Sequence, residues 1–315
     1  MHAWEQIQKT VDYIEDELSE EIQIETLAHM AGLSRFYFQR LFKRLVKRPV
    51  NEYIKLRRLA RASAALTDTD RRIVDVAMDF GFSSHETFTR AFKEAYGITP
   101  EEYRAVPVRL NQIYKPELLL NYTMIDEDVP LITNSIVIEI TRKKVDTAQI
   151  YAGLSAQVPI SQAPVGEATG IDIPGQLWDA FHRQKVDMPH IVQDSAEIGV
   201  SMMGETENGT FTYFVGGASK SNTADDGHMT TWQLAAGEYV VCCFEAENVE
   251  TLTTQALGKA ISYLFGTWLA KRGLVTHSFS MEKYGKPMPD GAYMELWVMP
   301  VHLKDMEKPP SEVAS

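Results

Sequence analysis

The chain has 315 residues, of which 44% are hydrophobic and 23% charged, and its formal net charge is −12. This length suits two domains of roughly 100–200 residues each better than one small core. Its only two cysteines, Cys242 and Cys243, are adjacent in an apolar run, which excludes a disulfide framework and favours a reducing compartment. Because no apolar stretch is long enough to span a bilayer and the acidic first segment is unlike a signal peptide, we expect a soluble, cytoplasmic protein with no membrane partner.

The charge is distributed unevenly along the first sixty residues. Residues 1–34 carry one basic and eight acidic side chains, whereas residues 35–61 carry ten lysines and arginines and one glutamate. The acidic net charge therefore conceals a basic stripe, and a phosphate backbone would meet this local field. The alternative is that the stripe is an ordinary solvated helix face.

Helical periodicity fills residues 1–106. In the first helix the apolar residues Trp4, Ile7, Val11, Ile14 and Leu18 recur at steps of three and four. The segment IETLAHMAG predicts a second helix that ends at a glycine, which can adopt positive φ without steric cost. The serine at position 34 can then cap a third helix by accepting a hydrogen bond from a free amide.

The third helix has an apolar face and a polar face. Phe38, Leu41, Phe42 and Leu45 fall at i, i+3, i+4 and i+7 and should face the core. The opposite face suits base edges and phosphates, because arginine can pair with guanine, glutamine with adenine, and an apolar ring can touch a thymine methyl. Its residues are Arg35, Phe36, Gln39, Arg40 and Lys43. The alternative for Phe36 is that it packs at the edge of the core.

A long helix to about Leu66 follows and should separate this motif from a second copy. Arg57, Arg58 and Arg61 on this helix can contact phosphates, or they are ordinary surface arginines. The second copy repeats the first with offsets of 49 or 50 residues. The matched pairs are Ala28 and Ala77, Gly32 and Gly81, Phe38 and Phe88, Arg40 and Arg90, Phe42 and Phe92, and Lys43 and Lys93.

Each copy consists of a helix that stops at glycine, a turn that contains serine, and a helix with one apolar and one basic face. This pattern is typical of helix-turn-helix DNA binding, so the chain is predicted to carry two major-groove readers in one all-α domain. The candidate DNA-binding residues of the second reading helix are His85, Glu86, Thr87, Arg90 and Lys93.

The remainder of the chain alternates strand-like and helix-like segments. Each half has the order strand, helix, strand, strand, which predicts an α+β domain of two related halves with helices on one side of the sheets. We assign residues 1–107 to the double helix-turn-helix domain, 108–133 to a linker or the start of the second domain, 134–305 to the α+β domain, and 306–315 to a tail.

The α+β domain contains a candidate site for a lipophilic cation. Glu282 lies in a predicted strand, and a carboxylate surrounded by aromatic rings would attract a cation by charge and by the ring faces. A charged ligand would also offset the cost of desolvating the carboxylate. The candidate ligand-binding residues are Glu282, Tyr284, Trp178, Trp268 and Trp297. The alternative is that Glu282 faces solvent and that the tryptophans belong to the core.

Other chemistry has little support in the sequence. The eight histidines show no paired metal-ligand spacing, and neither a phosphate-cradling glycine loop nor a nucleophile elbow is present. We therefore expect no metal, no cofactor and no enzymatic activity.

Residues 5–106 resemble the AraC/XylS family of transcription regulators, most specifically in the stretch GFSSHETFTRAFKEAYGITPEEYR. The resemblance implies base contacts from Phe36, Gln39 and Arg40. In the second reading helix it implies contacts from His85, Glu86, Thr87 and Arg90. Close relatives have tryptophan where this chain has Phe36 and glutamine where it has Glu86. Either the Glu86 carboxylate accepts a hydrogen bond from a cytosine amino group, or the second helix docks mainly on the DNA backbone.

The second half resembles the GyrI-like effector-binding domain, through Trp178 and Phe181 and the segments YLFGTWLAKRGLVTHSFSMEKY and ELWVMPV. The order of the two domains is similar to that of Rob-type regulators. This resemblance implies a pocket between the halves for amphipathic or aromatic molecules, often cations, near a glutamate that matches Glu282.

The expected function is a sequence-specific transcription regulator that binds double-stranded promoter DNA and responds to a small amphipathic or cationic effector. RNA polymerase is a further candidate partner. Two alternatives stay open. Some GyrI-like proteins hydrolyse small reactive compounds, which would make Glu282 a general base. The domain could instead sequester a ligand or bind a protein partner, with vestigial DNA binding.

Overall fold

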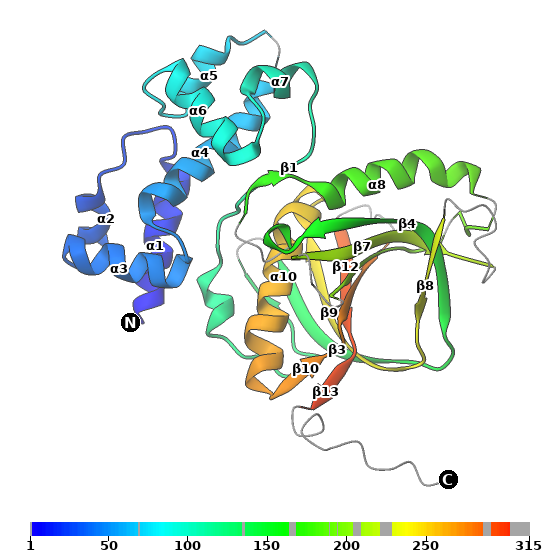
Figure 1. Cartoon of the computed structure of the whole chain (residues 1–315). Helices are drawn as coiled ribbons and strands as arrows, with labels where there is room; N and C mark the ends of the chain where they lie inside the picture. The colour runs from blue at the N-terminus through cyan, green and yellow to red at the C-terminus, as the bar shows by residue number, and fades with distance from the viewer. Residues whose placement is uncertain are drawn as a thin grey trace. The chain divides into compact units, whose positions relative to one another are not determined.

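The computed structural model describes residues 2–68, 70–133, 136–163, 168–188, 190–193, 195–203, 209–220, 229–285 and 291–302. They form two compact units (Figure 1). The first unit comprises Met1–Tyr122 and Glu167–Asp172, and the second comprises Thr123–Gly166 and Ile173–Ser315. The expected linker, residues 108–133, is thus divided between the units. The expected tail, residues 306–315, lies outside the described residues.

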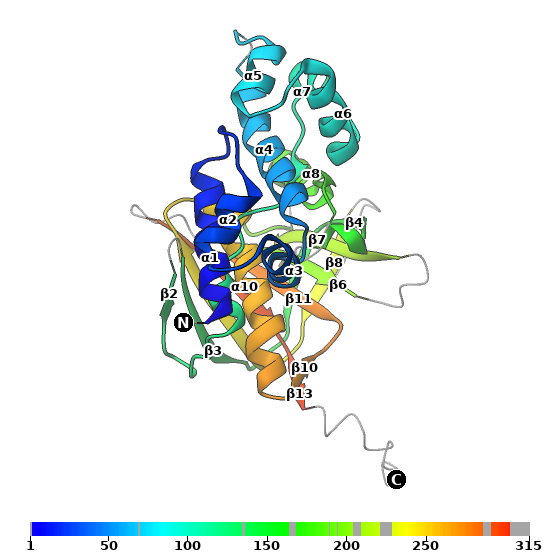
Figure 2. The ribbon, with the colours of Figure 1, turned by 90° about the vertical axis from the view of Figure 1, so that its left-hand side faces the viewer.

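The first unit is helical. Its helices are α1 (Ala3–Asp16), α2 (Ile24–Met30), α3 (Arg35–Val46), α4 (Val50–Leu66), α5 (Ile73–Asp79), α6 (His85–Tyr96) and α7 (Pro100–Ala105). Figure 2 shows the long helix α4 running from the group of α1, α2 and α3 to the group of α5, α6 and α7. After α7 the chain forms β1 (Leu110–Asn111) and the short helix η1 (Leu118–Asn121), and β1 pairs with β5 (Gly170–Ile171).

Both helix-turn-helix motifs use the local signals predicted from the sequence. The turns after α2 and α5 hold Gly32 at φ 67° and Gly81 at φ 73°, a region that favours glycine. The Ser34 side chain accepts a hydrogen bond from an amide in the first turn of α3, and the Ser84 side chain caps α6 in the same way. These signals fix where each reading helix begins.

Each motif has its own hydrophobic core, and α4 contributes to both. Phe38 and Phe42 are fully buried in the first core, and Phe88 and Phe92 are fully buried in the second. The amino-terminal half of α4 packs into the first core and its carboxy-terminal half into the second. Because the phenylalanines bury one face of each reading helix, the other face is left outside the core.

The second unit is built on one nine-stranded antiparallel sheet, in the order β2-β3-β9-β12-β11-β6-β7-β4-β8. The strands are β2 (Leu131–Ile132), β3 (Val137–Val145), β4 (Gln149–Pro159), β6 (Glu197–Met202), β7 (Thr210–Ala218), β8 (Thr230–Leu234), β9 (Gly237–Ala246), β11 (Phe279–Tyr284) and β12 (Ala292–Val298). A separate pair joins β10 (Leu274–Thr276) to β13 (Pro300–His302).

Two helical segments pack on the sheet. The helix α8 (Ile173–Gln184) contacts β4 and β7 and is followed by η3 (Lys185–Asp187); the short helix η2 (Ile160–Gln162) follows β4. The longer segment consists of α9 (Val249–Thr251), the π-helical η4 (Leu252–Ala256), α10 (Leu257–Tyr263) and the π-helical η5 (Leu264–Leu269), and it packs on β9. No described helix has the length and apolar character that crossing a membrane requires.

The two predicted halves are present in the sheet. One half has the order β4, α8, β6, β7, and the other has the order β9, α9 to η5, β11, β12. Each half contributes three neighbouring strands, and the halves meet where β11 pairs with β6. In that pairing the residue opposite Glu282 is Gly199. The predicted strand carboxylate therefore lies at the junction of the halves.

Candidate nucleic-acid interface and ligand cluster

The solvent-facing side of α3 presents the predicted base-reading side chains. Phe36 is 67% exposed, so it does not pack at the edge of the core as the alternative required. Arg40 and Lys43 are exposed and Gln39 is half-buried. Arg35 is exposed too, but its guanidinium pairs with Glu25 of α2 at 2.7 Å. The exposed face of α3 thus combines an apolar ring with hydrogen-bond donors and positive charge.

The corresponding side of α6 is less uniformly basic. Arg90, Lys93 and Glu86 are exposed, whereas Thr87 and His85 are half-buried. The Thr87 hydroxyl lies 3.1 Å from the hydroxyl of the Ser84 cap, and His85 Nε2 lies 2.9 Å from the Glu101 carboxylate in α7. The structure therefore ties Thr87 and His85 to neighbouring side chains.

Glu86 lies in the first turn of α6. A hydrogen bond from its own backbone amide and another from the Ser84 hydroxyl lower the pKa of its carboxyl group. The helix dipole also favours a negative charge at this end of a helix. Glu86 is therefore ionised at neutral pH and repels phosphates, whereas Arg90, one turn later, attracts them.

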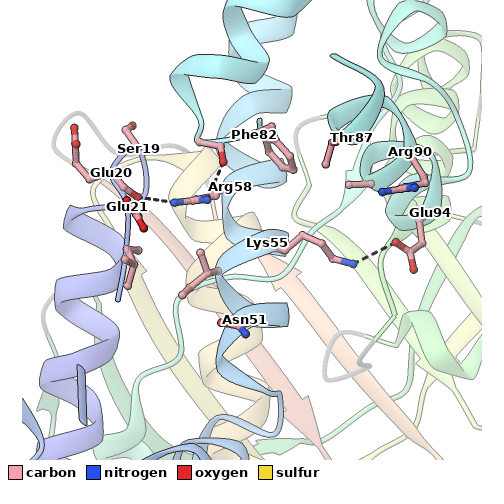
Figure 3. Close-up of a pocket in the computed structure, with 14 residues that line it drawn as sticks. Ser19, Glu20, Glu21, Asn51, Lys55, Arg58, Phe82, Thr87, Arg90 and Glu94 are labelled. Carbon is pink, nitrogen blue, oxygen red and sulfur yellow. Dashed lines mark hydrogen bonds and ion pairs between the residues drawn. The ribbon is translucent and has the colours of Figure 1, made fainter. Parts of the chain in front are cut away.

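An open pocket of about 560 Å³ adjoins α6 within the first unit (Figure 3). Two predicted reading residues, Thr87 and Arg90, line it. From α4, Lys55 donates a hydrogen bond across the pocket to Glu94 of α6 at 3.2 Å. This pocket could not be predicted from the sequence, because Lys55 and Glu94 are 39 positions apart and no periodicity relates them.

Arg58 forms part of the wall of this pocket and holds three carbonyl groups together. Its guanidinium donates hydrogen bonds to the carbonyl oxygens of Leu18 at 2.8 Å, Glu20 at 2.6 Å and Gly81 at 3.0 Å. A Cβ atom at Gly81 would lie 2.6 Å from the central carbon of the guanidinium. Position 81 thus requires glycine for two reasons: a Cβ atom there would collide with the Arg58 guanidinium, and the backbone has positive φ. Through these hydrogen bonds Arg58 joins the two helix-turn-helix motifs.

Arg57 is buried and forms an internal ion pair. Its Nε and Nη2 atoms each donate a hydrogen bond of 2.7 Å to the Glu15 carboxylate, and Nη1 donates to the Ile113 carbonyl at 2.6 Å. Burial alone would raise the pKa of Glu15, but Arg57 and the Tyr53 hydroxyl outweigh it and lower the pKa. Both interpretations of Arg57 from the sequence, a phosphate contact or a surface arginine, are therefore wrong.

Glu282 of β11 lies in a cluster of aromatic side chains. It is only 4% exposed, so the alternative of a solvent-facing residue is wrong. Its Oε2 atom accepts hydrogen bonds from the hydroxyls of Tyr213 at 2.9 Å and Tyr284 at 3.0 Å. The Trp178 indole on α8 donates to the Tyr213 hydroxyl at 3.1 Å, and its ring meets the Tyr284 ring edge-on at 4.7 Å. We call these four residues the ligand cluster.

Two residues of this arrangement were missed in the sequence. A Cβ atom at Gly199 would lie 2.4 Å from the Tyr213 hydroxyl and 2.9 Å from Glu282 Oε2, so glycine leaves the space that these groups occupy. Tyr213 is 69 positions from Glu282, and β6 lies between their strands in the sheet. Only knowledge of the strand order could have placed Tyr213 beside the carboxylate.

Trp268 and Trp297 lie outside the ligand cluster. Trp268 is fully buried, donates to the Ile125 carbonyl at 3.1 Å and carries the Arg272 guanidinium over its ring at 4.4 Å. The Trp297 indole donates to the Glu295 carboxylate at 2.7 Å. The structure thus brings together three of the five predicted ligand-binding residues.

The cluster can hold a positive charge against a carboxylate and the faces of aromatic rings. Among the residues that the structure describes, no group of histidine, cysteine, aspartate and glutamate side chains is arranged to bind a metal ion.

Comparison with known proteins separates the same two parts of the chain. A family of helix-turn-helix domains matches residues 27–105, and a family described as integron-associated effector binding protein matches residues 165–301. The regulatory protein SoxS of Salmonella typhimurium is 37% identical over 98 residues, which are 31% of this chain and 92% of SoxS.

Two longer relatives each match a little over a third of the chain or less. The uncharacterized HTH-type transcriptional regulator YbfP of Bacillus subtilis is 44% identical over 104 residues, 33% of this chain and 35% of YbfP. The right origin-binding protein of Escherichia coli is 36% identical over 127 residues, 38% of this chain and 44% of that protein. The matched part thus spans less than half the length of each of these two relatives.

Proposed function

This chain belongs to the AraC/XylS family of transcription regulators, with an AraC-type helix-turn-helix domain followed by a GyrI-like effector-binding domain, and from that premise we propose how it binds DNA and its effector. The first domain binds promoter DNA through Phe36, Gln39 and Arg40 of α3 and through Thr87 and Arg90 of α6. The second domain binds a small amphipathic or cationic molecule at the ligand cluster. RNA polymerase is the proposed further partner through which DNA binding affects transcription.

The duplicated reading helix is the observation that carries the DNA-binding proposal. In both copies two buried phenylalanines fix the inner face, and the side chains suited to base edges lie on the outer face. Arg40 can fork onto a guanine, Gln39 onto an adenine, and Phe36 can touch a thymine methyl. One chain with two such helices can occupy consecutive major-groove segments about 34 Å apart, so this domain needs no dimer.

We expect steep salt dependence, because the basic side chains of α3 displace counterions from phosphates. The slope of log K against log salt should be about −0.9 for each phosphate neutralised, so Lys43→Ala should make the slope less steep by about 0.9. The measurement is duplex affinity by fluorescence anisotropy at several salt concentrations. Lys9→Ala, which removes an exposed lysine of α1, is the control and should leave the slope unchanged. An unchanged slope in Lys43→Ala would remove this lysine from the interface.

The burial of Glu282 supports the effector proposal. A buried carboxylate is costly unless hydrogen bonds or an opposite charge compensate it, and here two tyrosine hydroxyls donate to it. A lipophilic cation would add the opposite charge, and its apolar groups would contact Trp178 and Tyr284. The effector can alter DNA binding only if it has unequal affinities for two states of the chain.

Glu282→Gln should weaken the binding of tetraphenylphosphonium, used as a probe cation, by about tenfold or more, which corresponds to about 1.4 kcal/mol. The amide keeps the shape of the side chain but removes the negative charge. Isothermal titration calorimetry measures the affinity. Glu295→Gln is the control, because Glu295 is also buried and accepts hydrogen bonds from a tyrosine hydroxyl and an indole, and from Lys143 at 2.6 Å, yet lies outside the cluster. Equal affinities of wild type and Glu282→Gln would reject the charge-pairing role.

A further inference from the structure

A short segment of the chain, Ala168–Asp172, packs in the first unit although α8, in the second unit, follows it directly. It belongs to the stretch Glu167–Asp172 that is part of the helical unit. Within it, β5 pairs antiparallel with β1, with Ile171 opposite Leu110. The backbone amide of Asp172 also donates to the Arg109 carbonyl at 2.9 Å. This segment is therefore an integral part of the DNA-binding unit.

Two side-chain hydrogen bonds complete the attachment. The Thr169 hydroxyl donates to the carbonyl oxygen of Ala95 at 2.6 Å. The Asn111 side-chain amide donates to the Ala168 carbonyl at 2.8 Å. Ala95 lies in the last turn of α6, where carbonyl groups have no partner within the helix. Thr169 thus supplies a hydrogen bond that the carboxy-terminal end of the second reading helix lacks.

At its other end the segment leads into α8, which carries one residue of the ligand cluster. Asp172 is followed in the chain by Ile173, the first residue of α8, and α8 carries Trp178. Besides the bond from Trp178 to Tyr213, α8 is held to β6 by His182 Nε2, which lies 2.9 Å from the Glu197 carboxylate. A ligand that displaces Trp178 would therefore move α8, and the covalent chain would transmit that movement to Thr169.

We infer that Thr169 is a positioning residue for the second reading helix, and that Ala168–Asp172 transmits the state of the ligand cluster to that helix. With Trp178 bonded to Tyr213, Thr169 holds the last turn of α6. When α8 moves, the Thr169 hydroxyl leaves Ala95, and the end of α6 that follows Arg90 loses its support. This inference rests on the proposed function, because it requires α6 to contact DNA and the ligand cluster to change state.

The first test measures positioning in the free chain. Thr169→Val keeps the side-chain shape but removes the donor, so hydrogen exchange of the amides in the last turn of α6 should become about fivefold faster, as the loss of one hydrogen bond allows. Thr169→Ser keeps the donor and should restore the wild-type rate. The control is Thr254→Val, which removes a hydroxyl-to-carbonyl bond of the same 2.6 Å length in the second unit. If the α6 amides of Thr169→Val exchange at the wild-type rate, the inference is overturned.

The second test measures transmission and uses no ligand. Trp178→Phe removes the indole donor to Tyr213 but keeps an aromatic ring. It should change two quantities by about threefold or more: the hydrogen-exchange rate of the α6 amides and the affinity of the chain for a selected duplex. When Thr169→Val is also present, Trp178→Phe should no longer change either quantity. Effects of equal size with and without Thr169→Val would overturn the inference, as would no effect of Trp178→Phe at all.

The two tests separate this inference from the proposed function. The exchange measurements need neither tetraphenylphosphonium nor DNA, so they decide the inference even if the effector class is wrong. Conversely, unchanged cation affinity in Glu282→Gln would reject the ligand proposal and leave the exchange result standing.

Discussion

Arg40→Ala is expected to weaken binding to the cognate duplex by about 1–3 kcal/mol, which is about 5- to 150-fold, because one bidentate base contact contributes roughly this much discrimination. Arg40 is exposed, and the buried phenylalanines of α3 keep it on the outer face. The loss should depend on sequence. Changing the base pair that Arg40 reads should strongly weaken duplex binding by the wild type. The same change should have little effect on duplex binding by Arg40→Ala.

The measurement is an electrophoretic mobility shift at fixed salt, with a duplex selected from a random pool. Arg72→Ala is the matched control, because Arg72 is an exposed arginine of the same unit that pairs with Asp75 and lies outside both reading helices. It should bind within about twofold of wild type, as expected for a residue remote from the contacts. Equal affinities of Arg40→Ala and Arg72→Ala would remove Arg40 from the interface.

Arg57→Met should lower the free energy of unfolding of the helical unit by about 3–5 kcal/mol, because removing one partner of a buried ion pair leaves the other charge unpaired. The group that loses its closest cation is Glu15, whose side chain is only 5% exposed and whose remaining cation, Arg61, lies 3.9 Å away. Arg57 also donates to the Ile113 carbonyl, so this contact is lost as well. Chemical denaturation with hydrogen exchange of the α4 amides reports the stability of this unit.

The loss in Arg57→Met should depend on pH. In the wild type the pKa of Glu15 is lowered on folding, so its contribution to stability is present above its unfolded pKa and is lost as the pH falls through the folded value. Without Arg57, burial still acts to raise the pKa of Glu15 while the strongest lowering influence is gone, so the Glu15 carboxyl group takes up a proton more readily in the variant than in the wild type. The stability gap between variant and wild type should therefore narrow on acidification below about pH 5. A loss under about 1 kcal/mol at neutral pH, typical of a surface pair, would contradict this account.

The reading helices could be predicted from the sequence because their signals are local. The spacing of Phe38 and Phe42 identifies the buried face of α3, and the glycine turn and serine cap identify where the helix begins. The repeat of the same signals about fifty residues later gives α6. The outer faces follow from helix geometry, so their exposed residues needed no tertiary information.

The buried side-chain contacts and the β5–β1 pairing could not be predicted from the sequence, because they join segments that are far apart in the chain. Arg57 is 42 positions from Glu15, and helical periodicity does not distinguish it from the neighbouring Arg58. The strand pattern around Glu282 predicts a strand but not its neighbours, so Tyr213 was missed and Trp268 and Trp297 could not be separated from Trp178. The pairing of β5 with β1 could not be predicted either, because strands of two residues have no periodic pattern in the sequence.

We propose that one chain reads two consecutive major-groove segments with α3 and α6. Hydroxyl-radical footprinting at one chain per duplex tests it directly. We expect two protected regions whose centres are about one helical turn, or about 10 base pairs, apart. Arg40→Ala should weaken protection mainly in one region and Arg90→Ala mainly in the other. A single protected region, or loss of the same region in both variants, would contradict it.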